Sequence, residues 1–264
     1  MTPQQAEKIA NEFKCRASKS GDMMTNDRSG KNIGETCKTY LKEWLNERLY
    51  GRCKTFTSKY TEKGLQTEED GITLIAVNRN KFYKKNTERK ENEWIIGECD
   101  IYSKDESLVI DNKSSYELST FPMWETDLKS KANITQVKCY AGLWNAENAL
   151  VCFTLNNMKA EQLDTQLEQM DYYKRKENER NGIQEGATDL ELARFVNERI
   201  FTKEKFEIYR SSQFPALKDF EFIEIPETKR YKEFSVEIKQ DEIEAIYQRV
   251  EDCRKILKEL LLQH

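Results

Sequence analysis

The sequence almost lacks histidine: the only one among its 264 residues is the last, His264. Ser-His-Asp triads, Cys-His pairs and His-rich zinc or iron sites all need an imidazole at the reacting atoms, so these classes of active site are almost excluded. Any catalysis must therefore depend on carboxylates, on lysine, or on a hard cation that oxygen atoms bind.

Paired cysteines and long apolar runs are missing as well. The seven cysteines are scattered and form no CxxC motif, which is typical of free thiols in a reducing compartment and excludes zinc ribbons. No segment approaches the roughly 18 uninterrupted apolar residues of a membrane helix. The first residues, MTPQQAEKIANEF, resemble neither a secretory signal nor a transit peptide. We expect a soluble, cytoplasmic protein with no membrane partner.

Charged residues are abundant, at 34%, but the net charge of −4 does not by itself indicate a nucleic-acid partner. Residues 1–60 differ from the rest, with 12 Lys and Arg against 7 Asp and Glu. This asymmetry is compatible with a basic groove on an acidic protein, and equally with an ordinary solvated mixture of charges. The 12 Phe, 12 Tyr and 4 Trp argue against a disordered chain.

With only four prolines and ten glycines, hydrophobic periodicity is the main guide to secondary structure. Helical periodicity predicts helices over 3–14, 33–50, 57–76, 132–147, 157–181, 187–210 and 240–263. Strands are predicted over 93–102 and 107–115, which form a hairpin around SKDE, and over 149–155, 220–225 and 232–238. Because strands and helices intermix without strict alternation, we predict an α/β (α+β) fold with a central mixed β-sheet flanked by helices.

The composition changes after the strand at 149–155. Residues 157–210 are polar, charged and helical in pattern. We predict one domain over residues 1–264, with a core of about 15–155 and 216–264 and a helical insertion at about 157–210.

An acid and a lysine directly follow a compact apolar run. Six D/E-x-K triplets occur in this sequence, and each alone is most simply a solvated surface. Asp111 and Lys113 differ because they end the run LVIDNK just after the hairpin turn. Side chains alternate along a strand, so the two project from one face, ~7 Å apart along it. They could form a salt bridge, or half of a metal-dependent site that cleaves phosphodiester bonds.

A second acid faces this pair across the predicted hairpin. Asp100 ends the strand IIGECD and would lie near Asp111, although it could also cap a turn. Two carboxylates held close together repel each other unless a cation joins them. Ligands that are all oxygen favour Mg²⁺ or Mn²⁺ over zinc.

Two further segments supply polar side chains. KGLQTEE places Gly64 and Glu68 about one helical turn apart, so that the glycine would admit close backbone approach beside the acid. QVKCY places Gln136 and Tyr140 at i, i+4, with Gln136 suited to fixing Lys113 or a water. Glu68 could instead pair with a lysine, and the QVKCY helix could be an ordinary surface.

The order G-x-x-x-E, D, D-x-K, Q-x-x-x-Y resembles the PD-(D/E)XK nucleases, and within them the RecB-type branch that includes phage lambda exonuclease and YqaJ-type viral recombination exonucleases. The resemblance implies that Glu68, Asp100, Asp111 and Lys113 occupy the catalytic positions, with Gln136 supporting them. It implies that Asp100, Asp111 and Glu68 bind one or two Mg²⁺ or Mn²⁺ ions. Two features depart from the family pattern: Cys99 replaces a proline, and Asp111 replaces a glutamate of close relatives.

The segment RASKSGDMMTNDRSGK resembles the part of the family that binds a DNA phosphate. Ser18 and Arg28 match its serine and arginine, and Arg16 is a candidate for a further arginine. The insertion at 157–210 has no counterpart that we can place.

The resemblance implies a metal-dependent exonuclease of linear double-stranded DNA with a free end, in phage-type recombination. It also implies a single-strand annealing protein as partner and is compatible with a homo-oligomer. Two alternatives remain: a structure-specific or restriction-like endonuclease on the same core, and a non-catalytic binding module.

Overall fold

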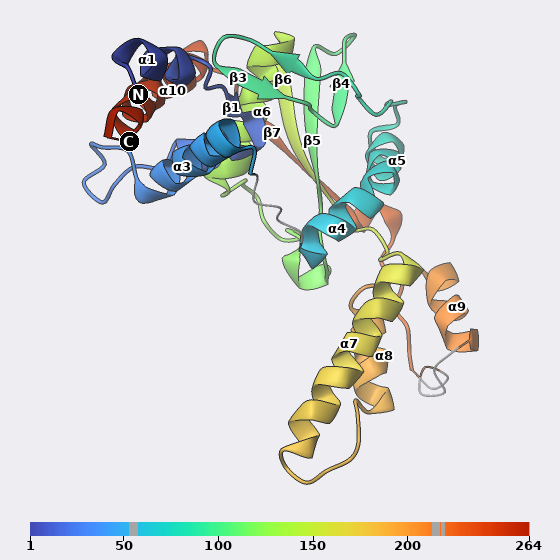
Figure 1. Ribbon diagram of the computed structural model, residues 1–264. Coiled ribbons are helices and arrows are strands. Elements are labelled where there is room, and N and C mark those ends of the chain that lie inside the picture. Colours follow the sequence, from blue (N-terminus) through green and yellow to red (C-terminus); the bar gives the residue numbers. More distant parts are fainter. Residues whose placement is uncertain (53–57, 213–216, 218–219, 264) are drawn as a thin grey trace.

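The computed structural model describes residues 1–52, 58–212, 217 and 220–263, so His264 lies outside the described residues. The main sheet has four strands in the order β4-β5-β6-β7, and β5 and β6 are parallel while the outer pairs are antiparallel (Figure 1). Its strands are β4 (Ile101–Ser103), β5 (Leu108–Ser114), β6 (Asn148–Thr154) and β7 (Tyr231–Val236). The predicted class, a mixed sheet flanked by helices, is confirmed.

A smaller sheet precedes the main one in the chain. It contains β1 (Cys15–Arg16), β3 (Ile95–Gly97) and β2 (Lys90–Glu91), with β1 parallel and β2 antiparallel to β3. The predicted strand over 93–102 is therefore divided between two sheets. Its break, between β3 and β4, contains Asp100.

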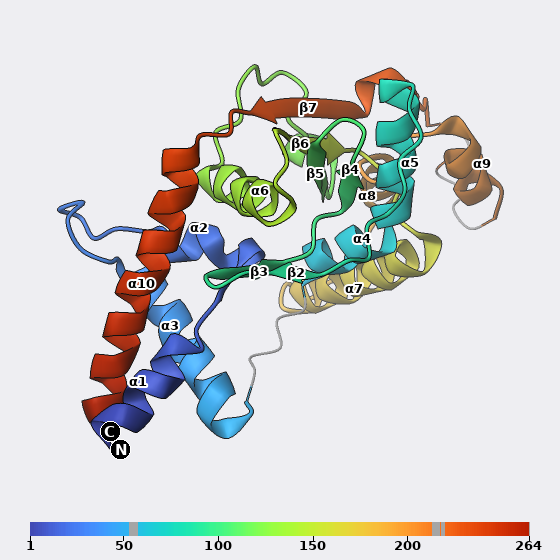
Figure 2. The same ribbon diagram turned by 90° about the horizontal axis from the view of Figure 1, so that it is seen from above.

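Helices cover both faces of the main sheet because its strands alternate between two apolar surfaces (Figure 2). On one face, α5 (Glu68–Arg79) packs Ile72 and Ile75 against Ile110 of β5. On the other face, α6 (Lys131–Trp144) packs Val137 against Val109. Asp111 follows Val109 on the α6 face of the strand.

The remaining helices surround this core. They are α1 (Pro3–Asn11), η1 (Ala17–Lys19), α2 (Ser20–Met23), α3 (Glu35–Tyr50), α4 (Lys59–Gln66), η2 (Leu118–Thr120), η4 (Glu227–Lys229) and α10 (Gln240–Gln263). The first and last helices lie side by side, and Lys258 forms an ion pair with Glu7 at 3.0 Å (Figure 1). None of the described helices has the length and apolarity needed to cross a membrane.

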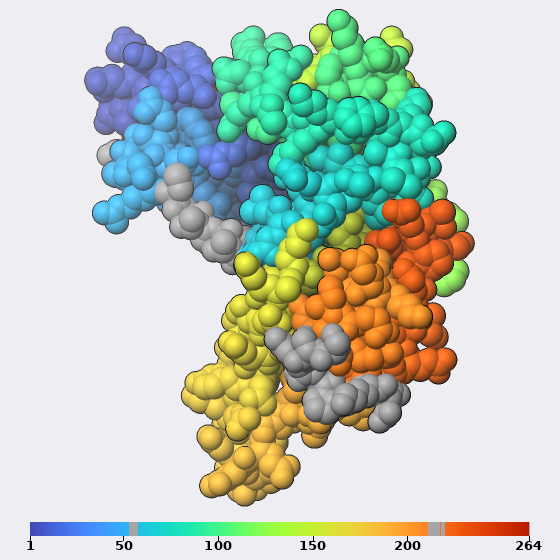
Figure 3. Space-filling model, turned by 90° about the vertical axis from the view of Figure 1, so that its right-hand side faces the viewer, coloured from blue at the N-terminus to red at the C-terminus, as the bar shows by residue number. Residues whose placement is uncertain are grey.

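Residues 157–210, the helical arm, project from the core (Figures 1 and 3). The arm contains α7 (Ala160–Glu179), α8 (Asp189–Asn197) and most of α9 (Lys203–Ser212). Its helices share a buried apolar cluster, which includes Leu163, Leu167, Val196 and Phe206 of the arm and also Tyr116. The predicted helical character of 157–210 is confirmed.

Three further predictions of secondary structure are wrong. The predicted helix over 187–210 is two helices, α8 and α9, separated by residues 198–202. Residues 220–225 form no strand: Phe222 stacks on Phe206 with ring centroids 4.2 Å apart, and Phe220 also packs on this ring. The alternating apolar residues therefore pack on the arm instead of pairing in a sheet. The predicted helix over 57–76, whose first residue lies outside the described residues, is two helices, α4 and α5, because the backbone leaves helical geometry at Thr67.

Candidate active site

The hairpin register places Asp100 beside Asp111. Ile101 pairs with Ile110, so the next residues outward along the two strands are these two acids. The backbone N–H of Asn112 donates to Asp100 Oδ2 over 2.5 Å. Burial raises the pKa of Asp100 to about 7, and the Asp111 carboxylate adds to this effect.

Asp111, Lys113 and Gln136 form a closed ring of polar contacts. Asp111 is only 2% exposed, and the Lys113 Nζ lies 2.9 Å from its Oδ2. Gln136 Oε1 accepts a hydrogen bond from Lys113 Nζ at 3.0 Å, while Gln136 Nε2 donates to Asp111 Oδ1 at 3.3 Å. The Tyr140 hydroxyl accepts a second hydrogen bond from Nε2 at 2.9 Å and so fixes the amide. Burial raises the pKa of Asp111, and the Lys113 ammonium opposes this rise.

Glu68 is the first residue of α5 and belongs to the same electrostatic environment, because its charge helps to raise the pKa of Asp100. Its Oε2, however, accepts a hydrogen bond from Lys85 Nζ at 2.8 Å. The pairing of Glu68 with a lysine, left open by the sequence, is therefore present. Among the described residues, no three Asp, Glu, Cys or His side chains are arranged as a complete metal site.

The expectation that Gly64 allows a close approach is wrong. A side chain at Gly64 would meet nothing within 4 Å, whereas one at Gly71 would lie 2.2 Å from Asn112 Nδ2. The close contact of helix and strand is therefore made one helix later, in α5. There the Asn112 side chain accepts a hydrogen bond from Thr154 at 3.0 Å.

The residues expected to bind a DNA phosphate come from different segments of the fold. Ser18 lies in η1, whose Ala17 packs close to Gly97, as does the Tyr140 ring. Arg28 is exposed in the loop between α2 and α3. Arg16 is bound by Glu47, with Nη2 at 2.8 and 2.7 Å from the two carboxylate oxygens.

Sequence reasoning missed two contributors to this site. Lys85 belongs to the basic run RNKFYKKNTERK, and the sequence does not indicate which of these lysines contacts Glu68. Asn112 is the spacer of the D-x-K triplet, and its backbone role follows only from the register of β4 and β5. A search for hydrogen-bond donors next to each acid in a predicted hairpin could have found Asn112.

The fold around this site is that of known exonucleases, which agrees with the PD-(D/E)XK nuclease superfamily that the motifs resemble. A phage-related exonuclease from Haemophilus somnus 129PT has a TM-score of 0.67 and 25% sequence identity, over 95% of this chain and 96% of that one. The alkaline exonuclease LHK-Exo from Laribacter hongkongensis has a TM-score of 0.59 at 12% identity, over 98% and 96% of the two chains. LHK-Exo in complex with dAMP matches with a TM-score of 0.55 at 11% identity, over 99% and 97%.

No family model and no curated protein matches the chain. The three alignments extend over 95 to 99% of this chain, so the likeness is not confined to one segment. Exonucleases are thus the class of enzyme that the fold supports.

Proposed function

We propose that this protein is a Mg²⁺- or Mn²⁺-dependent exonuclease that hydrolyses linear double-stranded DNA, in phage-type recombination. The observation that carries the proposal is the ring of Asp111, Lys113 and Gln136, with Asp100 held beside it by the hairpin register. A salt bridge alone would need no second buried acid, and here the second acid raises the free energy of the site. The exonuclease neighbours support the same class of reaction.

The donor chemistry fits a hard divalent cation. Asp111 Oδ2 is buried, with the Lys113 ammonium 2.9 Å away, and the pKa of Asp100 is raised by burial and by the neighbouring Asp111 carboxylate. Asp100 and Asp111 would hold the ion, with Glu68 binding a water or a second ion once it leaves Lys85. When bound, such an ion supplies a water of lowered pKa and neutralises charge on the scissile phosphate.

The protein's own side chains then position the reaction. Lys113 is held between Asp111 and Gln136, so its ammonium is oriented to donate to a phosphoryl oxygen or to the attacking water. Gln136 keeps its oxygen toward Lys113 because its amide nitrogen donates to Tyr140 and Asp111. An in-line attack by water would leave a 5′-phosphate and a 3′-hydroxyl, and positioning and electrostatics would supply most of the rate.

The proposed partner is double-stranded DNA with a free end. The complex of LHK-Exo with dAMP is an example of a nucleotide bound to this fold and supports the choice of substrate. Ser18, Arg28 and Arg16 are the proposed phosphate-binding residues, and Arg16 would have to exchange Glu47 for the phosphate. A single-strand annealing protein, a homo-oligomer and a cytoplasmic location belong to the same proposal.

The test compares the active-site triplet with a matched one. Asp111→Asn and Lys113→Met should each lower Mg²⁺-dependent degradation of end-labelled linear duplex by about 100-fold or more. Asp127→Asn and Lys129→Met, in a triplet of equal spacing on an exposed loop, should stay within about twofold because they touch no reacting group. Unchanged activity in Asp111→Asn or Lys113→Met would overturn the assignment.

The same assay separates the alternatives. Cleavage of a covalently closed circle would favour the endonuclease, whereas a strict need for a free end supports the exonuclease. Absence of cleavage, together with no Mn²⁺ affinity that depends on Asp100 and Asp111, would favour a non-catalytic binding module.

A further inference from the structure

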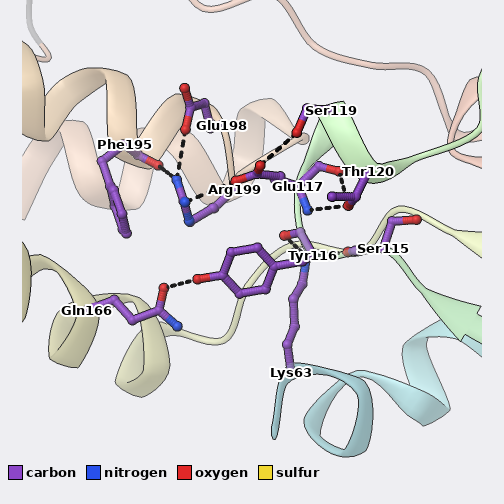
Figure 4. Close-up of polar contacts among 10 residues, drawn as sticks. All are labelled: Lys63, Ser115, Tyr116, Glu117, Ser119, Thr120, Gln166, Phe195, Glu198 and Arg199. Carbon is purple, nitrogen blue, oxygen red and sulfur yellow. Dashed lines mark hydrogen bonds and ion pairs between the residues drawn. The ribbon is translucent and has the colours of Figure 1, made fainter. Parts of the chain in front are cut away.

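A fully buried lysine binds the chain just beyond the proposed active site. Lys63 of α4 is 0% exposed, and its Nζ donates hydrogen bonds to the backbone oxygens of Ser115 and Tyr116, both at 2.8 Å (Figure 4). No carboxylate forms an ion pair with it among the described residues. Burial lowers the pKa of Lys63 to about 7, and the Arg199 charge contributes to this shift.

The helical arm binds the same segment from the other side. The Tyr116 hydroxyl donates to Gln166 Oε1 of α7, and Arg199 Nη2 lies 3.1 Å from Glu117 Oε2 (Figure 4). Arg199 is itself 5% exposed. Its Nη1 donates to the oxygen of Phe195, at the end of α8, over 3.0 Å. The three consecutive residues after β5 are therefore held by α4 on one side and by the helical arm on the other.

This segment is continuous with the proposed catalytic side chains. Ser115 is two residues beyond Lys113 and is the first residue after β5. The Thr67 hydroxyl donates to the backbone oxygen of Lys63 at 2.8 Å and lies 2.8 Å from the Ser114 hydroxyl. Thr67 directly precedes Glu68. The contacts made by Lys63 therefore connect the chain that carries Glu68 to the strand that carries Lys113.

A buried ammonium without a carboxylate is costly because its hydration is lost. At Lys63 two hydrogen bonds replace the water, together with the rings of Tyr116 and Phe201, whose centroids lie 6.0 and 5.4 Å from Nζ. A lysine needed merely to fill space could be replaced by methionine at lower cost. What Lys63 adds is direction, because its two donors fix two successive carbonyl groups in one orientation. Two carbonyl groups fixed in this way hold the backbone at the end of β5 in one position, and the catalytic side chains on that strand depend on this position.

We propose that Lys63, Tyr116 and Arg199 form a positioning clamp that holds the end of β5 against α4, and that the helical arm is thereby part of the active-site scaffold. The proposal rests on the proposed function, since it assigns the clamp to the placement of Lys113 and Glu68. None of the three residues is a catalytic residue. They act by fixing the position of residues 115–117, which directly follow the strand that carries Lys113.

The experiment compares variants of the clamp with a variant of a buried arginine in another part of the molecule. Lys63→Met and Arg199→Met should lower the single-turnover rate constant on linear duplex by about 10-fold or more, because small displacements of catalytic groups are costly. The dissociation constant for DNA, measured with Ca²⁺ in place of Mg²⁺, should stay within about twofold because no DNA-binding group is removed. Hydrogen exchange of residues 108–117 should accelerate in both variants.

Arg254→Met is the matched control. Arg254 is also buried and also donates to backbone oxygens, those of Phe13 and Glu93, but it pairs with Glu251 at 2.7 Å and joins α10 to Phe13 and to the chain before β3. Arg254→Met should lower the melting temperature about as much as Lys63→Met does, while leaving the single-turnover rate constant within about twofold of the wild type. Equal rate losses in the control and the clamp variants, or unchanged rates in folded clamp variants, would overturn the proposal.

If Lys63→Met and Arg199→Met do not fold, Tyr116→Phe still tests the proposal. It removes only the hydroxyl that donates to Gln166, and it should slow cleavage by about threefold with unchanged DNA affinity. Full activity in Tyr116→Phe, without faster exchange of residues 108–117, would overturn the role of this contact. The hydrogen-exchange result does not depend on catalysis, so a failure of the clamp can be distinguished from a failure of the nuclease assignment, which Asp111→Asn tests.

Discussion

Asn112 donates its backbone N–H to Asp100 Oδ2 over 2.5 Å, so the spacer between Asp111 and Lys113 orients the acid of the neighbouring strand. The side chain of Asn112 extends to the other face of the sheet, where it lies against Gly71 of α5. One residue thus connects the two acids to the helix that begins with Glu68. The candidate site is a single hydrogen-bonded unit built across a hairpin and a helix.

Substitution of Gly71 should disturb this unit. A methyl group there would lie 2.2 Å from Asn112 Nδ2 and 3.0 Å from Thr154 Oγ1, and overpacking of this kind costs about 1–3 kcal/mol. We expect Gly71→Ala to lower the free energy of unfolding by that amount and to slow cleavage. Urea unfolding and the linear-duplex assay measure the two effects.

Gly64→Ala is the control, because it adds the same methyl group in open space. It should raise stability by about 0.5–1 kcal/mol, through the helix propensity of alanine, and leave the rate unchanged. If the two alanine variants behave alike, the close approach of α5 to Asn112 does not constrain the site.

Asp100→Asn should stabilise the metal-free protein while abolishing cleavage. The folded pKa of Asp100 is raised to about 7, so the folded state binds the extra proton and stability falls as the pH rises from about 4 to 7. Above pH 7 the whole cost of the buried charge is present. We expect Asp100→Asn to be more stable than the wild type at pH 8, with a chelator present, by on the order of 2 kcal/mol. A less stable variant would contradict this prediction.

Lys85→Met should tighten the binding of a divalent cation. The Lys85 ammonium holds Glu68 Oε2 at 2.8 Å, and an incoming cation must replace it. Removal of this competitor should lower the dissociation constant for Mn²⁺, measured calorimetrically without DNA, by about three- to tenfold. Lys84→Met, which changes the adjacent exposed lysine, should not alter it. Weaker Mn²⁺ binding in Lys85→Met would show that the lysine organises Glu68 instead of competing for it.

Lys63 should make stability depend on pH in the alkaline range. Its folded pKa is lowered to about 7 from the usual 10.5, so the unfolded chain binds more protons between these values and stability rises with pH across that window. Arg199 and Glu117 are the charged groups that face it and act in opposite directions. Between pH 7 and 9 the wild type should gain on the order of 1–2 kcal/mol relative to Lys63→Met. Parallel pH profiles of the two proteins in urea unfolding would refute this.

Strand alternation was enough to predict much of the hairpin. The period of two places Asp111 and Lys113 on one face, and the short turn places Asp100 opposite, because both depend on local geometry. The i, i+4 spacing likewise predicts that Gln136 and Tyr140 share a helix face, and the structure has them hydrogen-bonded.

Contacts between distant segments could not be predicted in this way. Lys85 reaches Glu68 from a loop in which several lysines are equivalent by sequence. Phe220 and Phe222 alternate as a strand would, but the arm provides an apolar surface that competes with sheet pairing. In the sequence Lys63 resembles an ordinary surface lysine, and its burial depends on the packing of the helical arm against residues 115–117.

The adjacent positions of α1 and α10 have a practical consequence. These helices begin at Pro3 and end at Gln263, and they meet at one corner of the molecule, remote from the arm (Figure 1). Donor and acceptor dyes attached beyond them would lie close enough for efficient energy transfer in the native protein and would separate when the chain unfolds. The chain therefore offers a spectroscopic gauge of global folding that leaves the hairpin untouched.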